Sequence, residues 1–174
     1  MTIHGEHPFA DPEPLRDPVR RLRGRLGGAV TLWTAGSGST RTGLTVSSVL
    51  VALGEPGRVL GLVDPESDLA AAVAETGTAA VQLLAWEHRD LADAFAGVAP
   101  APGGLFRSAS WAQTPWGPVL DGIGAWAGIR VTEPAREVGW SVMLDGQVES
   151  VGIAEDDNDR PPLVTRRGRY LRPS

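Results

Sequence analysis

Several residue types and segment types are missing from this 174-residue chain, and each absence excludes a class of protein. There is no cysteine, which excludes disulfides, thiolate metal sites and cysteine catalysis. There is also no lysine, so all 16 basic residues are arginines. No apolar run approaches the ~20 residues of a membrane-spanning helix, and no basic segment followed by an apolar one marks a secretory signal. We therefore expect a cytoplasmic protein with no membrane partner.

The charge of the chain argues against nucleic acid as a partner. A net charge of −5 is poorly suited to coating a polyphosphate. One basic cluster stands out, and on a helix Arg16, Arg20 and Arg23 would share one face. The apolar residues of the segment would occupy another face: Val19, Leu22 and Leu26. That pattern predicts a surface helix packed on a core rather than a nucleic-acid site.

Turn signals and apolar periodicity predict a mostly β (α+β) domain with two or three short helices. Residues 1–16, rich in proline and acid, are expected to form a loose arm, and residues 17–174 the domain. The predicted helices cover residues 17–26, with Asp17 as N-cap, 69–75, capped by Ser67, and 88–95. The predicted strands cover residues 29–35, 41–53 (one strand or two), 58–63, 78–84, 123–132 and 138–153. Helices this few and short on so many strands favour a closed barrel.

The segment from Gly43 to Ser48, with the sequence GLTVSS, is the most informative stretch. It places three hydroxyls within four residues, after a Gly/Ser-rich turn. Alternation on a strand would put Thr45 and Ser47 on one face, and Val46 and Ser48 on the other. Short hydroxyls beside exposed backbone N–H groups bind an anionic oxygen without a charged side chain. An ordinary edge strand with polar residues facing water is the alternative interpretation.

Two further stretches follow at characteristic spacings: residues 81–97, which include VQLLA, HRDLA and FAG, and residues 162–170, PLVTRRGRY. Together with the hydroxyl segment, they resemble the flavin reductase family over roughly residues 17–172. The resemblance implies a Greek-key split β-barrel that forms a homodimer and binds FMN, with FAD as the alternative. It also implies NAD(P)H as co-substrate and a flavin-dependent monooxygenase as the partner that receives reduced flavin.

The resemblance also implies which residues hold the cofactor, although it names no catalytic residue. The anionic end would be formed by the hydroxyl strand and the cap of the second helix: Thr45, Val46, Ser47, Ser48 and Ser67. The ring end would lie near the next strand and the residue that follows it: Gln82, Leu83, Leu84 and Trp86. Trp86 could stack on a ring system there, and simple packing is the alternative.

The sequence departs from the family pattern at three places. Asp64-Pro65-Glu66-Ser67 stands where relatives carry Asn-Arg-Ser-Ser, so carboxylates replace a cation near the expected phosphate. Gln82 replaces an asparagine. Gly139-Trp140-Ser141 stands where relatives carry Gly-Asp-His, so the histidine associated with nicotinamide binding or hydride transfer is missing.

Three functions therefore remain open from the sequence. The chain is a flavin reductase, a non-catalytic flavin-binding protein, or a barrel dimer without a ligand. The scarcity of conventional catalytic motifs does not argue against a flavin reductase, because the cofactor carries the redox chemistry. No histidine pair has metal-ligand spacing, so no metal site is expected. FMN, FAD and deazaflavin are not separated, nor are NADH and NADPH.

Overall fold

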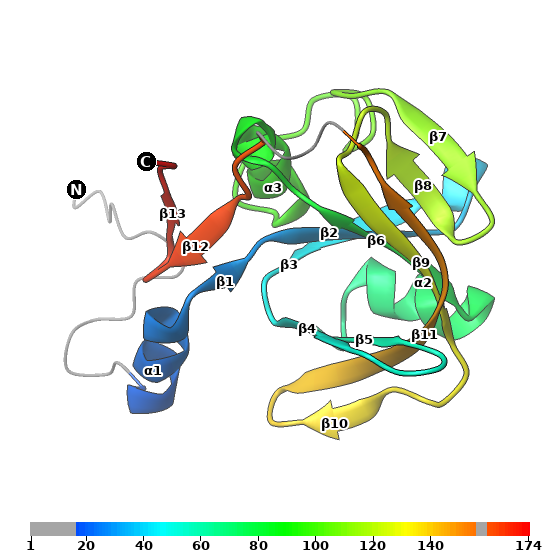
Figure 1. The fold of residues 1–174 in the computed structure, drawn as a ribbon, viewed down its shortest axis with the longest axis horizontal. Helices are drawn as coiled ribbons and strands as arrows, with labels where there is room; N and C mark the ends of the chain where they lie inside the picture. The colour runs from blue at the N-terminus through cyan, green and yellow to red at the C-terminus, as the bar shows by residue number, and fades with distance from the viewer. Residues whose placement is uncertain (1–16, 156–159) are drawn as a thin grey trace, which may run out of the picture.

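In the part of the chain that the structure describes, the fold consists of three short helices and a strongly curled antiparallel sheet (Figure 1). The structure, a computed structural model, describes residues 17–155 and 160–174, so the predicted loose arm at residues 1–16 lies outside the described residues. The helices are α1 (Pro18–Leu26), α2 (Asp68–Thr76) and α3 (Arg89–Phe95), with 3-10 turns η2 (Gly38–Thr40) and η3 (Trp86–His88). None of these helices is long and apolar enough to cross a membrane.

The strands form one large sheet, one small sheet and a separate hairpin. The large sheet contains β2 (Thr31–Ala35), β3 (Thr42–Val46), β4 (Val49–Ala52), β5 (Arg58–Val63), β6 (Thr78–Leu83), β9 (Ala125–Val131), β10 (Arg136–Val138) and β11 (Ser141–Ile153). The small sheet contains β1 (Gly28–Ala29), β12 (Val164–Arg166) and β13 (Arg169–Leu171). The hairpin is β7 (Trp111–Thr114) and β8 (Gly117–Leu120).

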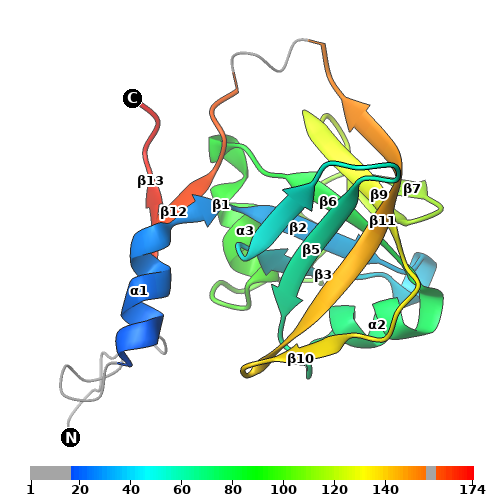
Figure 2. The ribbon, with the colours of Figure 1, turned by 60° about the horizontal axis from the view of Figure 1, so that its bottom comes forward.

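The large sheet is a split barrel rather than the closed barrel that the strand count favoured. Its strand order is β3-β2-β6-β9-β11-β5-β4, with β10 on β11, so β3 and β4 are its two ends. The chain passes from one end to the other through Ser47 and Ser48, without a ladder between β3 and β4. Figure 2 shows β4, β5 and β11 curling across the front of the barrel. The split-barrel prediction is confirmed.

The barrel core is built around Trp33, whose side chain is fully buried on β2. Its indole Nε1 donates to the Thr31 hydroxyl at 3.0 Å. The ring lies against the backbone of Gly61 on β5, where an added Cβ would come within 2.6 Å of the ring. A second apolar cluster, which includes Leu32, Leu84 and Phe95, packs between the barrel and α3.

Helix α1 begins as predicted but does not pack on the core. Asp17 caps it by accepting from the backbone N–H of Val19 at 2.9 Å. The prediction of a core-facing apolar side is wrong, because Val19, Leu22 and Leu26 are between 61% and 77% exposed. The helix is instead tied to the β12–β13 hairpin through its backbone, where the N–H of Arg167 donates to the carbonyl of Gly24 at 2.7 Å.

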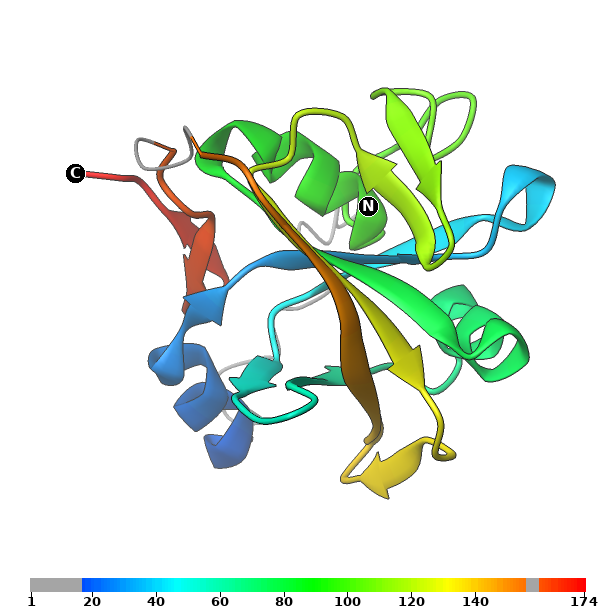
Figure 3. The ribbon, with the colours of Figure 1, turned by 45° about the vertical axis from the view of Figure 1, so that its right-hand side comes forward.

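The small sheet carries α1 away from the barrel. Strand β1 pairs with β12, with Gly28 opposite Thr165, so segments far apart in sequence meet there. Figure 3 shows α1 (blue) and the β12–β13 hairpin (red) together on one side of the molecule, joined to the barrel through β1. A recess therefore forms between this unit and the barrel edge.

Candidate functional site

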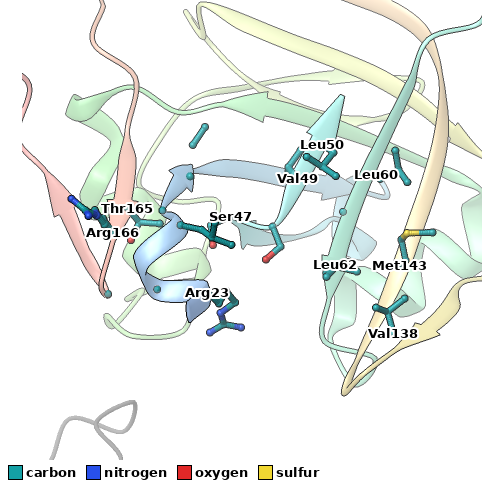
Figure 4. A pocket seen from close by; sticks show the side chains of 18 of the residues that line it. Arg23, Ser47, Val49, Leu50, Leu60, Leu62, Val138, Met143, Thr165 and Arg166 are labelled. Atoms are coloured by element: carbon teal, nitrogen blue, oxygen red, sulfur yellow. The ribbon is translucent and has the colours of Figure 1, made fainter. Parts of the chain in front are cut away.

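A groove of about 590 Å³ lies between α1, the small sheet and the edge of the barrel (Figure 4). The barrel contributes an apolar wall from β4, β5, β10 and β11: Val49, Leu50, Leu60, Leu62, Val138 and Met143. The charged residues that line the groove are arginines: Arg23, Arg136, Arg166 and Arg167. No carboxylate of the described residues lines it, although the chain as a whole carries a net charge of −5. The groove therefore suits a ligand with an apolar body and a negative charge.

Ser47 and Ser48 lie in the groove because β3 stops one residue before them. Strand β3 ends at Val46, so the alternation predicted through Ser48 does not continue. The carbonyl of Ser48 accepts from the backbone N–H of Leu62 at 3.0 Å, which fixes the bend against β5. Gly28 lies on the other side of the bend, where an added Cβ would be 3.2 Å from the Ser47 carbonyl. Among the described residues neither serine hydroxyl has a hydrogen-bond partner, so both are free to bind a ligand.

The arginines of the groove do not all point the same way. Arg23 projects from α1 into the open space that faces Leu62 and Val138 (Figure 4). Arg166 packs its aliphatic stem near Gly27, and its guanidinium lies on the far side of β12 in the same view. Of the two arginines labelled in this view, Arg23 is therefore the one that faces the interior of the groove. From its sequence pattern, Arg23 was expected on a solvent-facing helix surface with no connection to the serines.

Thr45 and Val46 lie on the hydroxyl strand but outside the groove. The Thr45 hydroxyl donates to the carbonyl of Ala92 at 2.7 Å and so links β3 to α3. The Val46 side chain is buried in the barrel core. Of the segment that was predicted as the anion end, the structure places only Ser47 and Ser48 among the residues that line the groove.

Ser67 caps α2, as predicted, and does not line the groove. Its hydroxyl accepts from the N–H of Ala70 at 3.2 Å and donates to the carbonyl of Asp64 at 2.7 Å. The Asp64 carboxylate accepts from the N–H of Glu66 at 2.8 Å. The loop before α2 therefore holds two carboxylates, and the serine hydroxyl already has two partners.

Two side chains that were predicted near the ring end, those of Gln82 and Leu84, are buried in the core. Gln82 is fully buried, and its amide binds Thr34, the carbonyl of Pro118 and the backbone N–H of Leu120. Leu84 is buried in the second cluster. A ligand therefore does not reach either side chain in this structure. Leu83, between them, is half exposed but does not line the groove.

Trp86 lies outside the groove, in the turn that leads into α3. The ring packs against the second apolar cluster, and the guanidinium of Arg89 lies 4.9 Å from its centre. The neighbouring His88 accepts from the N–H of Ala85 through Nδ1 at 3.0 Å, and burial lowers the pKa of its imidazole. These contacts give the turn a structural role.

Trp140 occupies the tip of the β10–β11 hairpin, beyond the wall residues Val138 and Met143. It is 86% exposed, and Trp140 is the one aromatic among the exposed large hydrophobic residues of the described chain. The turn is made by Gly139, whose φ of 59° suits glycine. A large exposed ring therefore stands at the tip of the hairpin whose strands supply Val138 and Met143 to the groove wall.

Comparisons with known proteins agree with this architecture. A model of the flavin reductase like domain matches residues 23–174. The FMN reductase (NADH) RutF of Ancylobacter novellus is 32% identical over 156 residues, which cover 89% of this chain and 83% of that protein.

Solved structures share the fold. The NADH:FAD oxidoreductase SgcE6 of Streptomyces globisporus superposes with a TM-score of 0.78 at 24% identity, covering 94% of this chain and 98% of that one. The styrene monooxygenase flavin reductase of Pseudomonas putida S12 superposes with a TM-score of 0.75 at 19% identity, covering 89% and 96%. The family match over most of the chain and the RutF identity together decide the assignment: the chain belongs to the flavin reductase-like domain family.

Proposed function

We propose that this chain is a cytoplasmic NAD(P)H-dependent flavin reductase that binds FMN in the groove, with FAD as the alternative. The observation that carries the proposal is the composition of the groove: an apolar wall, two serine hydroxyls and four arginines, with no hydroxyl partner and no lining carboxylate among residues 17–155 and 160–174. FMN combines a flat, largely apolar ring with a phosphate, so its two ends match the two kinds of surface. The residues present therefore fit the cofactor that the family implies.

The bound flavin would supply the redox chemistry, which is the transfer of hydride from a nicotinamide and of electrons to an acceptor. The protein's contribution is to bind and orient it. Leu50, Leu62 and Met143 would exclude water from one side of the ring, which strengthens the polar contacts nearby. The serine hydroxyls and the arginines would fix the polar end. No described residue needs to act as an acid or base for this role.

The names of two relatives support both electron transfer from NADH to flavin and a monooxygenase as the partner. RutF is named as an NADH-dependent FMN reductase. The Pseudomonas structure is named as the reductase of a styrene monooxygenase. By analogy, we infer that this chain passes reduced flavin to a monooxygenase partner.

We also propose that the chain forms a homodimer. Apolar side chains are exposed on α1, on and just after β4, and at the end of β11 in the described chain: Val19, Leu22, Leu26, Leu50, Val51, Leu53, Val151 and Ile153. Exposed apolar side chains in such numbers favour an interface. A second copy of the chain is its proposed occupant, and sedimentation at micromolar concentration tests this. A monodisperse monomer would contradict the dimer.

The remaining predicted contacts stay proposals. Four of them lie outside the groove and would contact only a ligand that extends past it, such as a long dinucleotide: Thr45, Ser67, Leu83 and Trp86. Their replacement tests this directly, because each side chain is at least partly exposed.

The experiment that tests the flavin site is a titration of the protein with FMN, followed by absorbance, and an assay of NADH and NADPH oxidation. Replacing both serines by alanine (Ser47→Ala with Ser48→Ala) should weaken FMN by about tenfold, the effect of roughly one or two hydrogen bonds to a charged group. Ser39→Ala is the matched control, because Ser39 is exposed on η2 and does not line the groove. FMN binding without NAD(P)H oxidation would indicate a flavin-binding protein instead of a reductase.

A further inference from the structure

We propose that Arg23 of α1, an element outside the barrel, holds the phosphate of the bound flavin nucleotide. The inference rests on the proposed function and specifies how the ligand lies in the groove. The phosphate would be placed at the α1 side, beside Ser47, and the ring at the opposite side, against β5, β10 and β11.

The position of Arg23 supports this assignment. Its side chain and Ser47 lie on the same side of the groove, across the open space from Leu62 and Val138 (Figure 4). Within residues 17–155 and 160–174, Arg23 forms no ion pair or hydrogen bond, and the Ser47 hydroxyl is likewise free. A guanidinium and a hydroxyl that both lack partners and face the same space form a pair of donors for an anionic oxygen.

The charge distribution favours this end over the loop before α2. A phosphate near Ser67 would meet the carboxylates of Asp64 and Glu66, and the Ser67 hydroxyl already has two protein partners. Like charges at short range disfavour binding, whereas the groove beside α1 presents arginines alone. The cation that this sequence lacks at residues 64–67 is thus supplied by a different element.

The opposite side of the groove suits the ring. Leu62, Val138 and Met143 present apolar atoms there, and the exposed Trp140 stands at the end of the same hairpin. Arg136 also lines this side, but its guanidinium already donates to the Met143 sulfur at 4.0 Å, and no hydroxyl of the described residues stands beside it in the groove wall. The α1 side offers a guanidinium and a hydroxyl together, so the orientation with the phosphate at Arg23 is favoured.

The test compares FMN with riboflavin, which has the same ring and no phosphate. The affinity of each is measured by fluorescence titration for the wild type, Arg23→Gln and Arg25→Gln. Arg25 is the matched control, because it lies on the same helix, is exposed and does not line the groove. Arg23→Gln should weaken FMN by about tenfold, the scale of a charge-assisted contact. Riboflavin affinity should stay unchanged in both variants, and Arg25→Gln should bind FMN as the wild type does.

Salt provides an independent readout. FMN binding to the wild type should weaken as the salt concentration rises, and this dependence should shrink in Arg23→Gln. Equal losses for FMN and riboflavin, or no loss for FMN, would overturn the role of Arg23 while leaving the flavin site intact. A wild type that binds neither flavin would overturn the proposed function and this inference with it. Since both arginines are exposed, we expect unchanged thermal unfolding, which confirms that the variants fold.

Discussion

Replacing Gln82 tests whether its side chain binds the flavin or stabilises the fold. The sequence predicts a flavin contact, whereas the structure indicates a role in stability. The side chain, on β6, is fully buried against β2 and β8. Its Nε2 donates to the Thr34 hydroxyl and to the carbonyl of Pro118, each at 3.2 Å, and its Oε1 accepts from the N–H of Leu120 at 2.7 Å. Gln82→Met keeps a similar length and removes all three hydrogen bonds.

The expected cost is about 3 kcal/mol in the free energy of unfolding. The buried N–H of Leu120 would lose its partner, and an orphaned buried donor costs about 1–3 kcal/mol. The two weaker donations add a smaller amount, because the carbonyl of Pro118 still accepts from the Thr34 hydroxyl. For a chain of this length, 3 kcal/mol corresponds to a fall in Tm of about 6–12 °C.

The assay is urea unfolding followed by far-UV circular dichroism, together with an FMN titration of each variant. Gln113→Met is the matched control, since Gln113 is exposed and its amide donates to two carbonyls, those of Gly36 and Thr114. Its effect should stay within about 0.5 kcal/mol. The reasoning is refuted if Gln82→Met costs less than about 1 kcal/mol. Weakened FMN binding at unchanged stability would instead restore Gln82 as a ligand contact.

Three further predictions concern the turn before α3, the barrel core and the C-terminal hairpin. Burial lowers the pKa of His88 from its ordinary 6.5, outweighing the opposite effect of Glu87, so the unfolded chain takes up the proton first as the pH falls. The free energy of unfolding should therefore decline more between about pH 7.5 and 5.5 in the wild type than in His88→Gln, and equal pH profiles would contradict this. Gly61→Ala should destabilise by about 2 kcal/mol because the new methyl group overlaps the Trp33 ring, and undisturbed urea unfolding would show that the ring can move. Tyr170→Phe loses a 2.7 Å hydrogen bond to Asp93, at a cost of about 1 kcal/mol in the free energy of unfolding. Amide hydrogen exchange in β12 and β13 should therefore increase, and unchanged exchange would show that this hydrogen bond does not hold the hairpin in place.

Elements with strong local signals were predictable from the sequence. Asp17 followed by proline, and Ser67 before an alanine-rich run, mark the starts of α1 and α2, and the structure shows both caps. The β7–β8 hairpin was missed, because the sequence between Gly97 and Ile123 is rich in glycine and proline, and Pro118 lies within a strand. Local sequence patterns depend on residues adjacent in the chain, so they do not reveal strands in a segment rich in glycine and proline.

The candidate site was predictable only in part, because its parts come from distant segments. Ser47 and Ser48 were identified through their motif. Arg23 and the apolar wall carry no local signal that connects them, since α1 is held beside the barrel edge by the C-terminal hairpin, which lies far along the chain. The burial of Gln82 was likewise invisible, because its partners lie far along the chain, at positions 34, 118 and 120.

The pairing of Gly28 with Thr165 also sets an order of events during synthesis on the ribosome. Strand β1 and helix α1 are translated early, but β12 follows only after every strand of the barrel has been made. Until then α1 has no hairpin to hold its backbone, and one wall of the groove does not exist. Contacts between such distant segments form late and slowly. A nascent chain would therefore complete its barrel before it gained the ability to bind a ligand in the groove.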